Sequence, residues 1–152
     1  MPWGGQGCRM LLPHDFVHTS SAVAMGACFG SSFFAVESWS GLTLWEGPCD
    51  GPVYATPLVD CTRESVITAD LRGSVQSWRA QPCRGGLSFE LAWRFTTPSA
   101  EPVFSSPVLA SGGTSIVFGC ADGKLYAVSA GDGACLWTHD ARAPIFSAAP
   151  LE

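Results

Sequence analysis

The stretch Ala127–Trp137 reads AVSAGDGACLW, and the stretch Ala35–Trp45 reads AVESWSGLTLW. The two segments lie 92 positions apart (127 − 35) and carry Ala, Val, Gly, Leu and Trp at the same places. A chain repeats such a pattern when both copies fill the same place in a repeated unit, and repeat architectures have periods of about 20–50 residues. The pair therefore predicts an internal repeat.

A second motif shows how long the unit is. GPVYATPLV at Gly51–Val59 returns as EPVFSSPVL at Glu101–Leu109, and more loosely as APIFSAAPL at Ala143–Leu151. The steps are 50 (101 − 51) and 42 (143 − 101) residues, and their sum is again 92. The chain therefore passes three times through a unit of about 46 residues, within the range typical of repeat folds.

Each unit reads as a set of short strands. In the copy with the clearest pattern, Ser115–Cys120 and Lys124–Val128 are rich in β-branched and aromatic residues, and an Asp-Gly turn joins them. A third strand ends at Trp137, and we expect a fourth within PIFSAAPL. No segment has the 3.6-residue period of an amphipathic helix. Four antiparallel strands in about 40–50 residues are typical of a β-propeller blade.

The predicted fold is all-β: an incomplete β-propeller of about three four-stranded antiparallel blades. We expect a poorly defined N-terminal leader at 1–21, followed by propeller repeats over 22–152. The blades would cover about 22–60, 61–110 and 111–152. Since closed propellers have about four to eight blades, we expect the chain to be a fragment of a larger propeller.

The repeated residues have a physical role in such a fold. A Gly is expected where a turn needs positive φ, and the following Trp is large and flat enough to cover the neighbouring blade. In the middle copy, Ser77–Trp93, the Gly-to-Trp gap is seven residues instead of four. We expect an insertion around Gln81–Leu87 that lengthens a surface hairpin. The structural repeat signature comprises Ala35, Gly41, Trp45, Trp93, Ala127, Gly133 and Trp137.

Three aromatic residues, Tyr54, Phe104 and Phe146, recur at one repeat position. They form a possible inner-strand stripe. Such a stripe could line a central channel or a peptide groove, or it could be the packing of the innermost strands. The packing interpretation is the one we favour from sequence.

The eleven-residue segments resemble the A-x-D-x-x-T-G-x-x-x-W signature of the pyrroloquinoline-quinone (PQQ) type propeller repeat. PVYATPLV, PVFSSPVL and FGCADGKLYAV are most similar to the C-terminal propeller of the β-alanine-activating, acyl-CoA synthetase-like (aminoadipate-semialdehyde-dehydrogenase-like) enzymes. The resemblance implies a propeller that follows an adenylation and a carrier domain. Neither of those domains has its motifs in this chain.

The composition and charge of the chain argue against some classes of function. Of the 152 residues, 47% are hydrophobic and 14% charged, and the net charge of −5 comes from scattered residues. This pattern gives no electrostatic footprint for nucleic acid or an anionic membrane. The N-terminus lacks the apolar stretch of a signal peptide. We therefore expect a cytoplasmic protein whose seven cysteines are reduced, with Cys28 and Cys120 buried as small hydrophobes.

We expect no catalytic, cofactor-binding or metal-binding residue in the chain. Quinone chemistry would need a Ca²⁺ site of carboxylate and amide oxygens, but the chain has no Asn, and Asp70, Asp122 and Asp132 fall in turns. His14 and His18 lack a third metal ligand nearby, and His139 is expected on the surface.

The sequence thus predicts a non-catalytic binding or scaffolding module, part of an acyl-activating enzyme. Its expected partner is a protein or a carrier domain, possibly within its own polypeptide, and a short chain would have to self-associate to close its ring. The alternatives are a fragment of a PQQ-dependent quinoprotein dehydrogenase and a propeller scaffold for protein assembly.

Overall fold

Three antiparallel sheets follow one another along the chain. The computed structural model describes residues 23–83 and 86–147. The first sheet holds β1 (Val23–Cys28), β2 (Ser32–Glu37) and β3 (Thr43–Pro48). The second holds β4 (Leu58–Asp60), β5 (Ser65–Ala69), β6 (Ser74–Cys83) and β7 (Gly86–Thr96). The third holds β8 (Val108–Ala110), β9 (Ser115–Gly119), β10 (Lys124–Ser129) and β11 (Cys135–Asp140).

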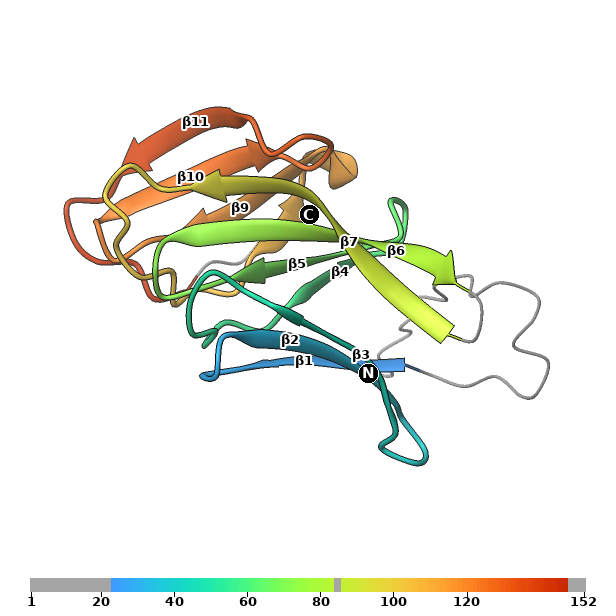
Figure 1. The fold of residues 1–152 in the computed structure, drawn as a ribbon. Coiled ribbons are helices and arrows are strands. Elements are labelled where there is room, and N and C mark those ends of the chain that lie inside the picture. The colour runs from blue at the N-terminus through green and yellow to red at the C-terminus, as the bar shows by residue number, and fades with distance from the viewer. Residues whose placement is uncertain (1–22, 84–85, 148–152) are drawn as a thin grey trace, which may run out of the picture.

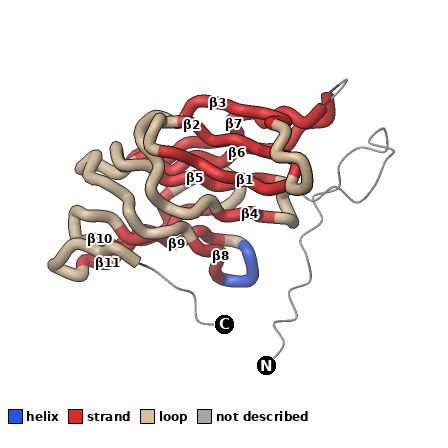
Figure 2. The backbone as a smooth tube through the Cα atoms, turned by 90° about the horizontal axis from the view of Figure 1, so that it is seen from below, coloured by secondary structure: helices blue, strands red, loops and turns tan. Residues whose placement is uncertain are grey.

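Within every sheet, strands adjacent in the sequence are paired, and the sheets are stacked in chain order (Figure 1). Between β8 and β9 lies the 3-10 turn η1 (Ser111–Gly113), drawn blue in Figure 2. The described residues contain no helix that could cross a membrane. This architecture confirms the prediction of an incomplete all-β propeller.

The turns inside the sheets follow their sequence signals. Gly73 and Gly123 close the β5–β6 and β9–β10 turns with φ of 77° and 86°, a backbone region that glycine enters without a steric penalty. Asp70 opens the first of these turns and accepts hydrogen bonds from the backbone N–H groups of Arg72 and Ser74. The Asp side chain thereby satisfies donors that the turn leaves without a strand partner.

The core consists of two layers, one between each pair of neighbouring sheets. The layer between the first and second sheets is built around the buried Phe33, Val66 and Trp78. The layer between the second and third is built around Ile67, Phe118 and other buried apolar residues. Side chains alternate faces along a strand, so Val66 and Ile67 on β5 supply one layer each. The middle sheet is covered on both faces.

The expected insertion is a long hairpin made of β6 and β7, paired from Ser74↔Thr96 to Cys83↔Gly86 with a register shift between Ser77 and Trp78. Its tip packs on the first sheet: Leu87 and Phe89 are 4% and 7% exposed and belong to the same layer as Phe33. The hairpin is therefore more than the surface extension that the sequence suggested. It adds apolar area between two sheets, so its length contributes to stability.

The fourth strand expected within PIFSAAPL lies partly outside the described residues. Residues 144–147 have no regular secondary structure, and 148–152 lie outside the described residues. The equivalent segments 52–57 and 102–107 are irregular as well, and the three-residue strands β4 and β8 follow them, at positions equivalent to 150–152.

Candidate functional site: an aromatic row across three blades

The Pro-Val-aromatic segments join one sheet to the next. Val53 donates its backbone N–H to the Cys28 carbonyl of the first sheet (3.1 Å), while the Pro52 carbonyl accepts from Leu71 of the second (2.8 Å). Val103 donates to Asp70 (3.1 Å) and Pro102 accepts from Ala121 (2.9 Å) in the same way. Since proline has no N–H to leave unsatisfied, it fits a position where only the carbonyl has a partner.

This geometry fixes where the aromatic residues point. Val53 and Val103 are 3% and 0% exposed, and the side chain that follows a buried one in extended backbone faces the opposite way. Tyr54 is accordingly 64% exposed, and Phe146, after Ile145, is 63% exposed. The stripe residues Tyr54, Phe104 and Phe146 thus lie in irregular segments, not in inner strands; Tyr54 and Phe146 face outward, whereas Phe104 is half-buried.

Three exposed rings and the half-buried ring of Phe104 form a continuous row. Phe29, in the β1–β2 turn, lies 6.1 Å from Tyr54, Tyr54 lies 5.9 Å from Phe104, and Phe104 lies 5.5 Å from Phe146, measured between ring centroids. The loops beneath are tied together, since the Thr56 N–H donates to the Ser106 hydroxyl. We call these four residues the aromatic row. Phe29 was missed from the sequence because it belongs to a turn, outside the Pro-Val-aromatic motif.

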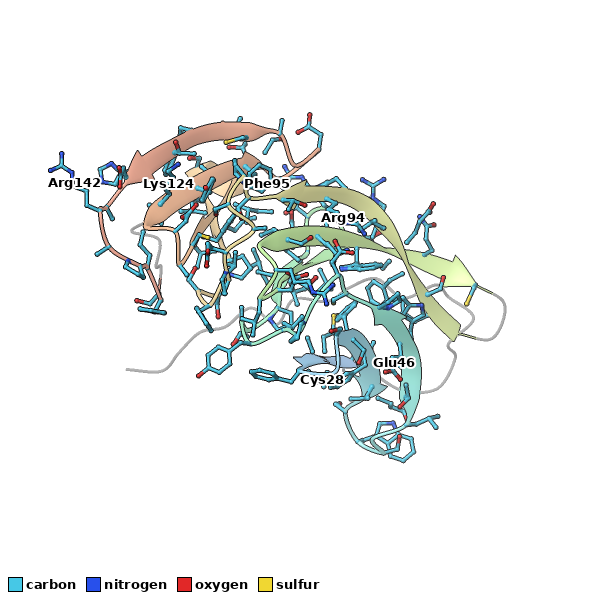
Figure 3. All side chains as sticks on the ribbon, turned by 60° about the vertical axis from the view of Figure 1, so that its left-hand side comes forward. Cys28, Glu46, Arg94, Phe95, Lys124 and Arg142 are labelled. Carbon is cyan, nitrogen blue, oxygen red and sulfur yellow. The ribbon has the colours of Figure 1, made fainter. Side chains whose placement is uncertain are left out.

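The aromatic row runs over all three sheets. Phe29 directly follows Cys28 at the end of β1, and Phe146 lies beyond the end of β11; Figure 3 labels Cys28 on the first sheet and Arg142 just after β11. Phe29, Tyr54 and Phe146 are each more than 60% exposed, and Phe104 connects Tyr54 to Phe146, so the four rings make one apolar surface that water solvates poorly. The row can stack on or enclose apolar and planar groups, and the Tyr54 hydroxyl is the one polar side-chain group that these four residues carry.

The signature glycine and tryptophan meet between the second and third sheets. Trp93 on β7 is 8% exposed, and its indole Nε1 donates to the Ala130 carbonyl at 3.1 Å. The ring lies over Gly133, where a Cβ would come within 2.5 Å of it, and Gly133 has φ of 74°. Gly133 therefore serves two needs, a positive φ and the close approach of an aromatic face.

The other signature residues occupy different surroundings. Trp45 packs against Phe33, Trp78 and Phe89 in the layer between the first two sheets, with ring centroids 5.1–5.9 Å apart. Trp137 on β11 is 47% exposed. Ala35 and Ala127 are fully buried and pair in register with Trp45 and Trp137. Gly41 has φ of 72° and open space around it.

The Asp carboxylates in the turns accept hydrogen bonds from nearby backbone and side-chain donors. Asp122 accepts hydrogen bonds from the Tyr126 hydroxyl (2.6 Å), the Ser99 hydroxyl (2.9 Å) and the Lys124 N–H (2.9 Å). Burial alone would raise its pKa, but these donors stabilise the charged form and lower the pKa below the usual value. Burial raises the pKa of Asp70. Both carboxylates are occupied by local donors, as the turn interpretation predicts.

Two of the expectations about the cysteines, that all are reduced and that Cys28 is buried, are wrong. Among the described residues, Cys28, Cys49, Cys83, Cys120 and Cys135 are free thiols, whereas Cys61 is disulfide-bonded. Cys28 is exposed rather than buried because its strand end is open to solvent, and a hydrogen bond with the Ser32 hydroxyl lowers its pKa. Burial raises the pKa of Cys49 to about 11, which makes that thiol a poor nucleophile.

No metal-binding geometry is found in the described part of the chain. Residues 23–83 and 86–147 contain no cluster of three or more His, Cys, Asp or Glu side chains. His139 is exposed on β11. His14 and His18 lie outside the described residues.

Comparisons with known proteins agree with this architecture. The sequence profile of one family, described as outer membrane protein assembly factor BamB and built on a PQQ-type repeat, matches residues 22–149. No curated protein sequence matches the chain. The link to the propeller of acyl-CoA synthetase-like enzymes therefore rests on the quoted motifs alone.

Solved propellers superpose on most of the chain. BamB from Moraxella catarrhalis aligns with a TM-score of 0.60 at 19% identity, covering 78% of this chain and 33% of that protein. The propeller domain of Cps50 (Swd1) from Myceliophteria thermophila gives 0.67 at 6% identity, covering 78% and 37%. The WD40 repeats of RRP9 give 0.65 at 14% identity, covering 78% and 35%. The chain thus spans about a third of these propellers, and it belongs to the PQQ-repeat family of the outer membrane protein assembly factor BamB.

Proposed function

We propose that the chain is a non-catalytic propeller segment that holds a protein partner on its aromatic row. The observation that supports this proposal is the contact of four rings from three successive blades, at centroid spacings of 5.5–6.1 Å. A large apolar patch on a soluble domain marks an interaction surface more often than chance exposure. Scaffold function also agrees with the membership of the family of an assembly factor.

The partner segment is expected to be an extended peptide with apolar or proline side chains. Aromatic side chains are enriched at protein interfaces because they offer a large contact area at a low cost in conformational entropy. The row lies on loops that inter-sheet hydrogen bonds hold in place, so little ordering is needed on binding. No charged residue belongs to the row, so we expect binding to depend weakly on salt.

Two parent proteins are proposed for this module. The motifs shared with the β-alanine-activating type support a cytoplasmic acyl-activating enzyme, in which the row would receive a carrier domain or another part of the same polypeptide. The family description supports a scaffold for membrane-protein assembly. An antibody to residues 86–147, applied to fractionated cells, separates these cases by the mass and the compartment of the endogenous protein.

The binding proposal is tested by peptide selection. Peptides that bind the chain are selected from a displayed random library. Their affinities are then measured for the unchanged chain, for the double variant Tyr54→Ser/Phe104→Ser and for the single variant Trp39→Ser. Trp39 is 74% exposed but outside the row, so it is the matched control. We expect the double variant to bind about tenfold or more weakly, the scale of losing an interface anchor, and Trp39→Ser to bind as the unchanged chain does. Equal binding by the double variant would refute the proposal.

A further inference from the structure

The β5–β6 turn of the second sheet holds two of the loops that carry the aromatic row. On one side, Leu71 donates its backbone N–H to the carbonyl of Pro52, in the loop of Tyr54 (2.8 Å). On the other side, the Asp70 carbonyl accepts, at 3.1 Å, from the backbone N–H of the residue before Phe104. The 5.9 Å spacing of the Tyr54 and Phe104 rings therefore depends on the shape of this one turn.

The Asp70 side chain fixes both the turn and the start of one loop. Its Oδ1 accepts the backbone N–H groups of Arg72 (2.9 Å) and Ser74 (3.0 Å), which hold the turn in shape. Its Oδ2 accepts the Gly51 N–H at 3.0 Å, at the start of the Tyr54 loop. Asp70 is 1% exposed, and hydrogen bonds to a charged acceptor are about twice as strong as neutral ones.

Asp70 is the one acid at its repeat position in the three described sheets. The backbone carbonyls of Cys28, Asp70 and Cys120 each accept, at 3.1 Å, from the N–H of the residue before a row aromatic, so the three positions are equivalent. Where Asp70 accepts from Gly51, Cys120 turns its thiol to the Glu101 carbonyl at 3.4 Å. Of the three residues, only Asp70 changes charge in the acid range.

The charged groups around Asp70 include a second carboxylate. Asp50 is held by the Ser74 hydroxyl (2.9 Å) and by the Arg94 Nε (2.7 Å). Burial raises the pKa of Asp70 and the charge of Asp50 adds to this, against the three N–H donors. The other titratable or charged residues of the neighbouring segments are Arg72, Cys49 and Glu101. Asp70 therefore takes up its proton at a higher pH than an unperturbed Asp, whose pKa is about 3.9.

We propose that Asp70 is a positioning residue of the aromatic row, which is ordered when this carboxylate is charged and loosened when it is protonated. Oδ1 accepts two N–H groups and Oδ2 only one, so the proton binds Oδ2, where it meets the Gly51 N–H as a second donor. That hydrogen bond is then lost and the Tyr54 loop is freed at its start. The expected consequence, weaker partner binding in weak acid, rests on the proposed function.

The loss is local and does not unfold the chain. Because the pKa of Asp70 is higher in the folded than in the unfolded chain, its contribution to the free energy of unfolding increases as the pH falls through the folded pKa. A purely structural role for Asp70 would leave the row unchanged in this pH range.

NMR of the free chain tests the positioning role without a partner. The chain has two tyrosines, Tyr54 in the row and Tyr126 in the core, so labelled tyrosine and phenylalanine rings give one row signal and one internal reference. From neutral pH to about pH 4, we expect the contacts of Tyr54 with Phe29 and Phe104 to weaken as the Asp70 carboxyl titrates, while Tyr126 stays unchanged. Ring contacts that persist after Asp70 is protonated would overturn the proposal.

Two variants make the comparison at neutral pH. Asp70→Asn keeps the size of the side chain, but its amide nitrogen meets the Gly51 N–H donor to donor, so we expect weakened Tyr54 contacts at every pH. Asp60→Asn is the matched control, because Asp60 is also 1% exposed on the second sheet and accepts from the β4–β5 turn instead of a row loop. Full Tyr54 contacts in the Asp70→Asn chain, or equal weakening by Asp60→Asn, would overturn the proposal. The titration of the unchanged chain decides the question even where a variant does not fold.

The affinity of a selected peptide links the position of the rings to binding. We expect Asp70→Asn to weaken binding at neutral pH about tenfold, the scale of losing one hydrogen bond to a charged group, and the unchanged chain to lose as much in weak acid. A peptide that needs the Tyr54 and Phe104 rings but binds the Asp70→Asn chain at full strength would overturn the role of Asp70. A peptide that ignores those rings would count against the proposed function instead, and the ring contacts of the free chain would still decide the role of Asp70.

Discussion

At the scale of single residues, surroundings decide what a repeated residue does. Trp45, Trp93 and Trp137 hold one position of the repeat, yet the first packs among aromatic rings, the second lies on Gly133 and the third is half exposed. Trp45 does not lie on a positive-φ turn glycine of the next sheet as Trp93 does, because the β6–β7 insertion replaces the short turn with a long hairpin. Trp93 should therefore contribute more to stability than Trp137.

The substitution Trp93→Phe tests this difference. It keeps most of the buried area but removes the indole donor, which leaves the Ala130 carbonyl without that partner. We expect the free energy of unfolding to fall by about 1–3 kcal/mol. Trp137→Phe, at a half-exposed site, should change it by about 0.5 kcal/mol or less. Urea unfolding of both variants measures the two losses in free energy of unfolding, and equal losses would contradict a special role for the contact of Trp93 with Ala130 and Gly133.

The stability of the fold at acidic pH should depend on the charge of Asp122. Hydrogen bonds from Tyr126, Ser99 and Lys124 favour its charged form in the folded state and lower its pKa, while the unfolded value is about 3.9. The stabilisation is therefore complete above the unfolded pKa and is lost as the pH falls through the folded pKa. The Asp122→Asn chain should be less stable at neutral pH, and the difference should shrink as the pH falls below about 4.

Glu46→Gln, which alters an exposed carboxyl on β3, is the control for this titration. Thermal unfolding midpoints measured across the acid range give the profile of each chain. A gap between the unchanged chain and Asp122→Asn that stays constant with pH would show that Asp122 does not act through its charge.

At the scale of elements, the β6–β7 hairpin is the part of the repeat that has changed most. Its added residues bring Phe89 within 5.3 Å of Phe33 and 5.1 Å of Trp45, between ring centroids. The insertion thus fills the place that a Gly–Trp contact fills between the second and third sheets. An element that departs from the repeat here supplies the contacts between the first two blades.

Phe89→Ala should therefore destabilise the chain by about 3–5 kcal/mol, as loss of a buried aromatic does. Leu91→Ala lies on the same strand, but Leu91 is 37% exposed and should cost about 0.5 kcal/mol. Denaturant unfolding of the two variants compares a buried and an exposed site of one element. Similar small losses would mean that the hairpin tip does not pack on the first sheet.

Strand positions and blade stacking could be predicted from the sequence because turn glycines and alternating apolar residues mark them locally. The Asp-Gly turn before Lys124 falls where β10 begins, and Trp137 lies within β11, which runs to Asp140, beyond the strand end expected at Trp137. The outward direction of Tyr54 could not be predicted, because it depends on hydrogen bonds that Pro52 and Val53 make to two different sheets. Phe29 joins the row only through this tertiary arrangement.

At the scale of the whole molecule, the chain is an arc of three stacked sheets that spans about a third of the solved propellers it matches. Its loops carry one aromatic surface across all three sheets. Stacking and partner binding thus use different surfaces, the sheet faces for the first and the loops for the second.

The central claim is that a protein partner binds the aromatic row, and an NMR titration of the isotope-labelled aromatic rings with a selected peptide tests it most directly. We predict that the resonances of Phe29, Tyr54, Phe104 and Phe146 shift together at one affinity, while those of Trp39 and Trp137 stay in place. Shifts confined to Trp137 and the β11 face, with the four row residues unchanged, would contradict the account.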